Sequence, residues 1–429
     1  MSRKGSRSGS SIGLGPGSGK GLGSARGVVS AVVLVVAGAS VGWLSFRAAM
    51  VRMLPATSPA IVQLAPRYPD AVLARTTALL VPRHGILDAA TLDSVRRAAA
   101  AAPLDARAYL ILGHQQLLDS MPDRAVATLE AGQRLDPRQR LIHLLLLDRY
   151  LRTARYADAA TQFSVLARIL GAAQVPIATA MAQMMIAPET RAAVRRTLRT
   201  DPVLERSVLV ALARSDTAPD AIFALASPAA RKDAGSPESW GPVLVKRLVD
   251  HGRYADARSI WQRIYGVPPA QAAALITNPS FRTRNTTPPF DWTLTASGLG
   301  AADIRANSLV VEYYGRDSGV LASQVLVLHP GRYRFEFTVD PGKTDGAAKL
   351  YWSLACGIGT GERNLAMNVT VAATAKPHRI VTGIVVPAGC PVQTLTLRGE
   401  AGEFPSPLSV TVSDLDLRPA SQAISETTP

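Results

Sequence analysis

Two cysteines are the residues of this 429-residue chain whose type and number most directly suggest covalent chemistry. Cys356 and Cys390 both lie in the last third of the sequence. A cysteine pair in an exported protein is a candidate disulfide, because thiols oxidise outside the reducing cytoplasm. Two buried free thiols are the alternative. The compartment argued below favours a bridge, which closes a loop of about 34 residues and adds a few kcal/mol of stability.

A glycine-rich stretch near the N-terminus, Ser11–Gly23, contains a Gly-Lys pair and therefore suggests a phosphate-binding loop. Such a loop needs a glycine five residues before the pair and Ser or Thr directly after it. Leu14 and Gly21 occupy those two positions, and the polar residues upstream cannot form the buried strand that feeds such a loop. The sequence therefore predicts no nucleotide cofactor.

Metal-binding and catalytic patterns are also missing from the sequence. The six histidines are scattered without the spacing of metal ligands, and no Gly-x-Ser-x-Gly motif occurs. Asp414 and Asp416 lie two residues apart on one expected strand, which suggests a calcium site or a carboxylate pair. Solvated acids at the end of a strand are the favoured interpretation. We expect no metal, no cofactor and no enzymatic activity.

Net positive charge belongs to the N-terminal tail and the middle of the chain, and the last third has none. The chain has a net charge of +15, residues 1–69 hold eight Lys or Arg and no acid, and residues 278–429 hold 13 of each sign. No basic stripe is interleaved with aromatic residues, so the composition predicts no nucleic-acid partner.

A membrane anchor is predicted at residues 27–46, after a flexible basic tail at residues 1–26. Gly27–Phe46 is free of charge and, as a helix, matches a hydrocarbon layer of roughly 30 Å. The basic tail stays in the cytoplasm, so the rest of the chain is exported. Ala37 and Ala39 offer the alternative of a cleaved secretory signal, but the long apolar run favours an uncleaved anchor.

Helical repeats are expected at residues 88–277, after a linker and first helices at residues 47–87. Residues 106–139 resemble a tetratricopeptide repeat, a helix–turn–helix unit of 34 residues. In this pattern Gly113 and Ala125 lie where two antiparallel helices touch, and Pro137 ends the second helix. The matching positions of this unit and the next are Tyr109, Gly113, Ala125, Pro137, Tyr150, Ala159 and Phe163.

The string RYADA at Arg155–Ala159 recurs at Arg253–Ala257 and indicates a further, detached unit. It contains Ala257, and Trp261 takes the place of Phe163. Residues 172–237 are expected to form degenerate helix pairs, with Pro188, Pro202 and Pro219 at helix starts. The resemblance to tetratricopeptide repeats implies a surface that holds protein partners.

A β-sandwich is predicted at residues 278–418, followed by a disordered tail at residues 419–429. In GRYRFEFTVDPG, alternation places Tyr333, Phe335, Phe337 and Val339 on one face and residues 332, 334, 336 and 338 on the other. Other short alternating runs lie between Gly or Pro turns without helical segments, which indicates a sandwich or jelly roll.

The opening and closing motifs of this domain resemble the galactose-binding-like jelly rolls of carbohydrate-binding modules. Asn278, Phe281 and Trp292 stand at the opening positions, although Arg282 replaces the acid usual after the phenylalanine. The resemblance implies that these aromatics are structural. Exposed rings are better sugar-binding candidates, and we identify three, of which the first two are adjacent so that one must point outward: Tyr313, Tyr314 and Tyr351.

The predicted fold class is multidomain α + β, with one transmembrane helix, a tetratricopeptide-like solenoid and an antiparallel β-sandwich. This order resembles anchored repeat proteins of bacterial exopolysaccharide gene clusters. The resemblance implies an inner-membrane, single-pass protein with a cytoplasmic N-terminus and periplasmic domains. Our first hypothesis is therefore a non-enzymatic envelope adaptor, whose array holds a protein of a polysaccharide machine and whose sandwich contacts glycan or packs on the array. The alternatives are a structural scaffold without sugar binding and a glycan-active hydrolase or lyase.

Overall fold

The computed structural model describes residues 23–54, 58, 67–80, 85–171, 174–344, 348–359, 363–371 and 376–420. The glycine-rich stretch up to residue 22, and the last nine residues of the predicted C-terminal tail, lie outside these ranges. Two compact units make up the chain, Met1–Arg155 and Tyr156–Pro429.

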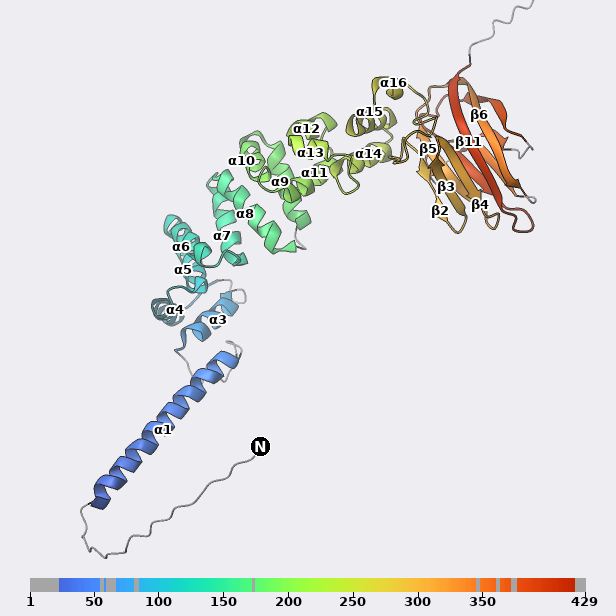
Figure 1. Cartoon of the computed structure of the whole chain (residues 1–429). Helices are drawn as coiled ribbons and strands as arrows, with labels where there is room; N and C mark the ends of the chain where they lie inside the picture. Colours follow the sequence, from blue (N-terminus) through green and yellow to red (C-terminus); the bar gives the residue numbers. More distant parts are fainter. Residues whose placement is uncertain are drawn as a thin grey trace, which may run out of the picture. The chain divides into compact units, whose positions relative to one another are not determined.

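Among the described residues, helices extend to residue 272 and strands follow them (Figure 1). The helices of the first unit are α1 (Gly23–Met53), α3 (Pro69–Leu80), α4 (Ala89–Ala101), α5 (Ala106–Leu118), α6 (Pro122–Leu135) and α7 (Arg140–Arg152). Those of the second unit are α8 (Tyr156–Ile169), α9 (Gln174–Ile186), α10 (Pro188–Leu198), α11 (Pro202–Arg214), α12 (Pro219–Leu225), α13 (Pro228–Lys232), α14 (Trp240–Asp250), α15 (Tyr254–Tyr265) and α16 (Pro269–Ala272).

The first helix, α1, has the length and composition needed to cross a membrane. Its apolar window, Val32–Met50, has 19 residues, and none of that window is buried inside the protein. This window extends beyond the end of the predicted segment 27–46, because the helix continues past Arg47. A helix of this kind near the N-terminus suits both a membrane anchor and a signal sequence.

Helices α5 and α6 pack at the small residues that the repeat pattern predicts. A Cβ added to Gly113 would lie 2.7 Å from the Leu129 side chain, and Ala125 is fully buried. Tyr109 donates a hydrogen bond from its hydroxyl to the carbonyl of Pro103 (2.9 Å). His143, 34 residues later, departs from the pattern, yet its Nε2 makes the same contact with Pro137 (2.9 Å). The repeat thus keeps this hydrogen bond with a different side chain.

A recurring turn joins the two helices of three repeat units. Ser120, Ala154 and Gly252 have φ values of 59°, 55° and 71°. The next residue in each turn donates its N–H to a carbonyl five residues earlier. The detached unit that RYADA indicates therefore has the turn geometry of the earlier ones, and its Ala257 and Trp261 are buried, as are Tyr150, Ala159 and Phe163.

Proline starts several helices in the segment without a clear repeat pattern. Pro188, Pro202 and Pro219 open α10, α11 and α12 as predicted, and Pro228 opens α13. Proline suits this position because the first turn of a helix leaves its N–H groups without intrahelical partners. Helix α11 packs against both α9 and α14, so the pairs continue through this segment.

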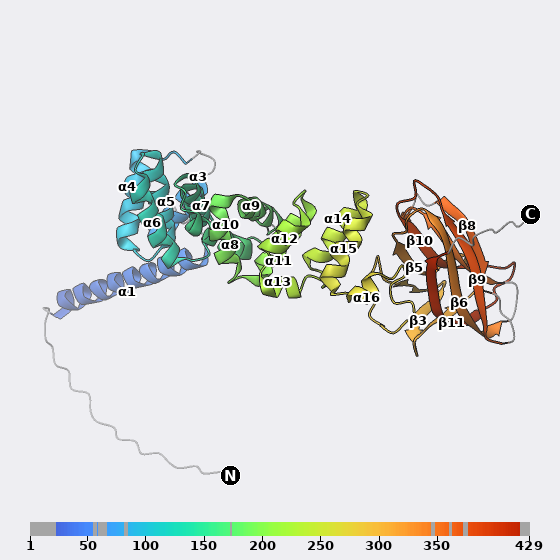
Figure 2. The same cartoon turned by 90° about the horizontal axis from the view of Figure 1, so that it is seen from above.

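Two antiparallel sheets form the sandwich, drawn in orange and red in Figure 2. The five-stranded sheet has the order β1 (Thr293–Leu294), β5 (Gly319–Leu326), β10 (Gln393–Glu400), β7 (Lys349–Cys356) and β8 (Arg363–Thr370). The six-stranded sheet has the order β2 (Ala296–Ser297), β3 (Gly300–Arg305), β4 (Ser308–Tyr313), β11 (Leu408–Pro419), β6 (Gly331–Thr344) and β9 (His378–Val386).

Aromatic rings fill the space between the sheets. Trp352 lies 5.8 Å from Trp292 and 5.9 Å from Phe335, measured between ring centroids, and all three side chains are fully buried. The predicted inward face of β6 is confirmed. One residue of its outward face, Glu336, is nevertheless buried as well, because three arginines surround it.

A short segment between α15 and the first strand ties the helices to the sandwich within the second unit. Trp261 donates its indole N–H to the carbonyl of Thr287 (2.7 Å) and its ring packs on Phe290. Gln324 of β5 donates to and accepts from the backbone of Thr277 (3.0 and 2.9 Å). Trp261 therefore packs against the start of the β domain as well as within its own repeat.

A disulfide between Cys356 and Cys390 confirms the predicted pairing. It joins the end of β7 to the turn before β10, and the two Cα atoms lie 5.6 Å apart. Both cysteines are buried at the edge of the sandwich core. The bridge thus fixes the ends of two neighbouring strands that carry the candidate site.

Candidate functional site

The outer side of the five-stranded sheet brings polar residues from three strands into register. Leu350, Trp352 and Leu395 point into the core, so the alternate residues of the same strands face outward. Arg398 of β10 lies opposite Tyr351 of β7, which in turn lies opposite Thr370 of β8. The next row contains Thr396, Ser353 and Asn368. We call these six residues the Tyr351 face.

Small hydroxyl side chains occupy the middle of the Tyr351 face. Ser353 and Thr396 are joined by a hydrogen bond of 2.6 Å and are nearly inaccessible to solvent. Asn368 and Thr370 on β8 are exposed, while Tyr351 and Arg398 are half-buried. The accessible part of the face therefore presents an aromatic ring, the Asn368 amide, a guanidinium group and the Thr370 hydroxyl side by side.

The three candidate tyrosines have different environments. Tyr313 is 1% exposed; its ring lies against Gly399 and its hydroxyl donates to the carbonyl of Asp317 (2.8 Å). The prediction that it can stack on a sugar is therefore wrong. Tyr314 is 41% exposed, but it follows β4 in the six-stranded sheet. Tyr351, in contrast, is half-buried on the outer side of the five-stranded sheet, between Arg398 and Thr370.

The residue types of the Tyr351 face suit a neutral, hydroxyl-rich ligand. An aromatic ring offers an apolar face to the C–H groups of a sugar ring. Hydroxyl and amide groups donate and accept hydrogen bonds, and a guanidinium group donates up to five. Few convergent polar groups beside an aromatic surface are the usual composition of a small-molecule or glycan site.

Arginines surround one buried carboxylate on the outer side of the six-stranded sheet. The Glu336 side chain is 2% exposed and pairs with Arg334 and Arg379, and with Arg418 at 3.0 Å. Arg418, and then Arg334 and Arg379, hold the pKa of Glu336 below its usual range, although burial acts in the opposite direction. Glu336 is therefore a carboxylate at neutral pH, and we call these four residues the arginine cluster.

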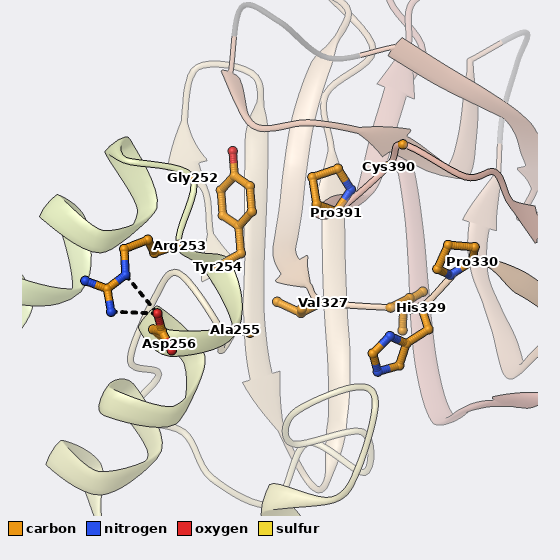
Figure 3. A pocket seen from close by; sticks show the side chains of 12 residues that line it. Gly252, Arg253, Tyr254, Ala255, Asp256, Val327, His329, Pro330, Cys390 and Pro391 are labelled. Atoms are coloured by element: carbon orange, nitrogen blue, oxygen red, sulfur yellow. Dashed lines mark hydrogen bonds and ion pairs between the residues drawn. The ribbon is translucent and has the colours of Figure 1, made fainter.

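A cavity of about 610 Å³ lies between the start of α15 and two loops of the sandwich (Figure 3). Tyr254 comes from the helix, while His329, Pro330 and Pro391 come from the loops before β6 and β10. Its charged residues, Arg253 and Asp256, pair with each other at 2.8 Å. The lining is otherwise largely apolar, so the cavity offers few groups that orient a polar ligand.

A second cavity of about 560 Å³ borders the opening segment of the sandwich. Burial raises the pKa of Asp291, whose carboxylate accepts N–H groups of Trp292 (2.8 Å) and Thr287 (3.2 Å). Asp291 is the one acid among the described residues that line this cavity. Hydrolysis of a glycosidic bond ordinarily uses two carboxyl groups. The described lining of this cavity contains one carboxyl group, that of Asp291.

The opening motif of the sandwich has a structural role. The Asn278 side chain accepts the N–H of Arg282 (2.8 Å), and Phe281 packs on Trp292 at 5.5 Å between ring centroids. The motif is not accompanied by metal ligands: within the described parts of the chain, no three His, Cys, Asp or Glu residues are grouped as metal ligands. Asp416, one of the two acids of the expected closing strand, lies 3.4 Å from Arg418 at the margin of the arginine cluster.

Sequence reasoning missed most of the residues on both surfaces. Alternation within the string VQTLTLRG separates Thr396 and Arg398 from the core leucines, but it does not reveal that β10 lies between β5 and β7. The arginine cluster likewise needs β11, β6 and β9 to be neighbours. The local signal that was available is the alternation of Arg332, Arg334 and Glu336 with the aromatic core residues along β6.

Comparison with known proteins yields similar solved structures only. No family model matches the sequence, and no curated protein matches it. The structure described as "CBM4 structure and function" is 14% identical, with 34% of this chain and 99% of that chain covered and a TM-score of 0.28. A TmCBM61 structure in complex with beta-1,4-galactotriose is 16% identical, with 34% and 99% covered and a TM-score of 0.24. The structure of pilF from Pseudomonas aeruginosa is 15% identical, with 47% and 93% covered and a TM-score of 0.25.

Proposed function

We propose that this chain is a non-enzymatic adaptor of the bacterial envelope, whose sandwich contacts a polysaccharide and whose helical array holds a protein partner. In this proposal α1 anchors the chain in the inner membrane, with the N-terminus in the cytoplasm and both domains in the periplasm. The machinery served is one that makes or exports polysaccharide. The single observation that carries the proposal is the Tyr351 face.

The Tyr351 face supports glycan contact because its groups act together. The ring of Tyr351 lies between Arg398 and Thr370 in the row across the sheet, so one sugar unit over the ring reaches donors on both neighbouring strands. Adjacent strands are about 4.8 Å apart, which is close to the width of a sugar ring. The disulfide between the ends of β7 and β10 supports export to an oxidising compartment.

Exposed leucines support a protein partner for the helical array. Leu141, Leu144 and Leu151 lie along one side of α7, and each is more than a third exposed. Apolar side chains grouped on one helix face are a usual feature of protein-binding surfaces. The partner in this proposal therefore presents an apolar helix or peptide.

Substitution of Tyr351 tests glycan binding. The full chain in detergent micelles is applied to an array of neutral and acidic polysaccharides, and the affinity for retained polymers is measured by biolayer interferometry. We expect Tyr351→Ala to weaken binding about 10-fold, because loss of the ring removes about 1.4 kcal/mol of contact. Tyr314→Ala is the matched control, since it removes an exposed tyrosine of the other sheet and should leave affinity unchanged.

Two results contradict the proposal. Equal losses in both tyrosine variants would mean that the ring of Tyr351 is not the contact. Retention of no polysaccharide by the full chain would favour the structural scaffold without sugar binding.

A further inference from the structure

The arginine cluster has a regular position on the six-stranded sheet. Arg334 of β6 lies opposite Arg418 of β11 and opposite Gly383 of β9. Two residues further along β6, Glu336 lies opposite Asp416 of β11 and Val381 of β9. Another two residues along β6, Thr338 lies opposite Arg379 of β9. The three guanidinium groups therefore surround one carboxylate across three neighbouring strands.

Positive charge exceeds negative charge in this cluster. The side chains of Arg334, Arg379 and Arg418 are 52%, 59% and 56% exposed, whereas Glu336 is 2% exposed. One carboxylate neutralises one of the three guanidinium groups, and Asp416 at 3.4 Å from Arg418 offsets part of the remainder. Each guanidinium carries five N–H donors, and the two oxygens of Glu336 accept few of them. Donors and charge therefore remain available toward solvent.

Glu336 also holds the arginines in place. A long exposed arginine normally loses side-chain entropy when it binds an anion. Contacts with one fixed carboxylate reduce that loss, because the guanidinium groups are already positioned.

An open position lies next to Arg334. Gly383 faces outward between Val381 and Val385, which are both exposed, and a Cβ added to it would have no atom within 4 Å. The row of Arg418 and Arg334 therefore ends at Gly383, where no side chain covers the sheet beside Arg334. A small anionic group fits beside Arg334 at that place.

We infer that the arginine cluster binds the anionic groups, carboxylate or sulfate, of an acidic polysaccharide. This inference rests on the proposed function, and it adds a second contact on the sheet opposite the Tyr351 face. Guanidinium groups bind such oxyanions through paired, charge-assisted hydrogen bonds. Two separate contacts on one domain increase the affinity for a long polymer beyond that for a short one.

Charge distribution favours a polysaccharide over a membrane surface or a nucleic acid. Residues 278–429 hold 13 basic and 13 acidic residues, so no broad positive field surrounds the sandwich. Uniformly charged surfaces and nucleic acids are bound by such broad fields. A local cluster beside Thr338 and two exposed valines suits anionic groups that are spaced along a hydroxylated, partly apolar polymer.

The test compares polygalacturonate with its methyl ester, which has the same backbone without the carboxylate charge. The affinity of the full chain in detergent for each polymer is measured at 50 and 200 mM salt. We expect the full chain to bind polygalacturonate about 10-fold more tightly than the ester at low salt. Arg379→Gln and Arg418→Gln should each reduce this ratio of the two affinities about threefold. A comparison of dextran sulfate with dextran tests the binding of sulfate groups in the same way.

Gly383→Leu and Arg305→Ala complete the design. Gly383→Leu fills the open position without removing a charge or a partner of Glu336, so it should reduce the ratio about fivefold while the melting temperature stays unchanged. Arg305 of β3 is an exposed arginine of the same sheet that pairs with Asp303 at 2.8 Å. Arg305→Ala therefore removes the same charge outside the cluster and should leave the ratio unchanged.

The inference is overturned if the full chain binds the two polymers equally, if Gly383→Leu retains the ratio, or if Arg305→Ala reduces it as much as the cluster variants do. Equal cluster-dependent binding of phosphatidylglycerol vesicles or a DNA duplex would also overturn it. Failure of the proposed function gives a different result. In that case Tyr351→Ala leaves the affinity for the methyl ester unchanged, while the ratio of the affinities for polygalacturonate and its ester persists.

Discussion

Trp261→Ala is expected to lower the free energy of unfolding of the second unit by about 3 to 5 kcal/mol, the usual cost of removing a buried aromatic side chain. The indole is 2% exposed and packs on Phe290 and Tyr265 at 5.9 and 5.7 Å between ring centroids. Its N–H donates to Thr287, so the substitution also leaves that carbonyl without this partner. Urea unfolding followed by circular dichroism measures the loss.

Trp261→Phe separates the packing of the ring from the hydrogen bond. It keeps most of the buried volume and removes the N–H donor, so we expect a smaller cost of about 1 to 2 kcal/mol. Because Trp261 joins α15 to the opening segment, Trp261→Ala should also split the unfolding of helices and strands into two transitions. A single transition within 1 kcal/mol of the unsubstituted chain would show that this contact does not couple the two parts.

Loss of the disulfide is expected to lower the stability of the sandwich by about 3 to 4 kcal/mol, since the bridge closes a loop of 34 residues. The double variant Cys356→Ala/Cys390→Ala removes the crosslink and leaves no free thiol. Its urea midpoint, followed by the fluorescence of the core tryptophans, measures the change. The Tyr351 face should lose affinity in parallel, because the bridge joins the ends of β7 and β10.

The redox state of the two cysteines in cells provides the control. We expect a thiol reagent of high mass to leave the chain from acid-quenched cells unmodified, and to modify both cysteines after reduction. Stability equal to that of the unsubstituted protein in the double variant, or free thiols in freshly quenched cells, would contradict a structural bridge formed after export.

Local patterns predicted the elements of the fold because they depend on neighbours in the sequence. The small residues Gly113 and Ala125 marked a helix contact, and alternation in β6 identified Phe335 and Phe337 as core residues. The cysteine pair indicated the bridge because the predicted export of the domain places both thiols in an oxidising compartment. None of these inferences needed knowledge of which strands lie side by side.

The site residues depended on strand order, which local patterns do not contain. The inward position of Tyr313 is the exception, because Leu309, Val311 and Tyr313 share the buried face of β4 while Glu312 faces outward. Packing over Gly399 places Tyr313 in the core and leaves Tyr314 outside. Glu336 was assigned to the solvent side, and its burial arises from arginines on β9 and β11, which are remote in sequence.

Hydroxyl-radical footprinting of the full chain, with and without a polysaccharide that it retains, tests the central claim most directly. We predict that the polymer protects Tyr351 and the peptides of β7, β8 and β10 that form the Tyr351 face, and that Tyr314 stays as reactive as in the free protein. Protection confined to other surfaces, or an unchanged reactivity of Tyr351 at saturating polymer, would contradict the assignment of this face as the glycan contact.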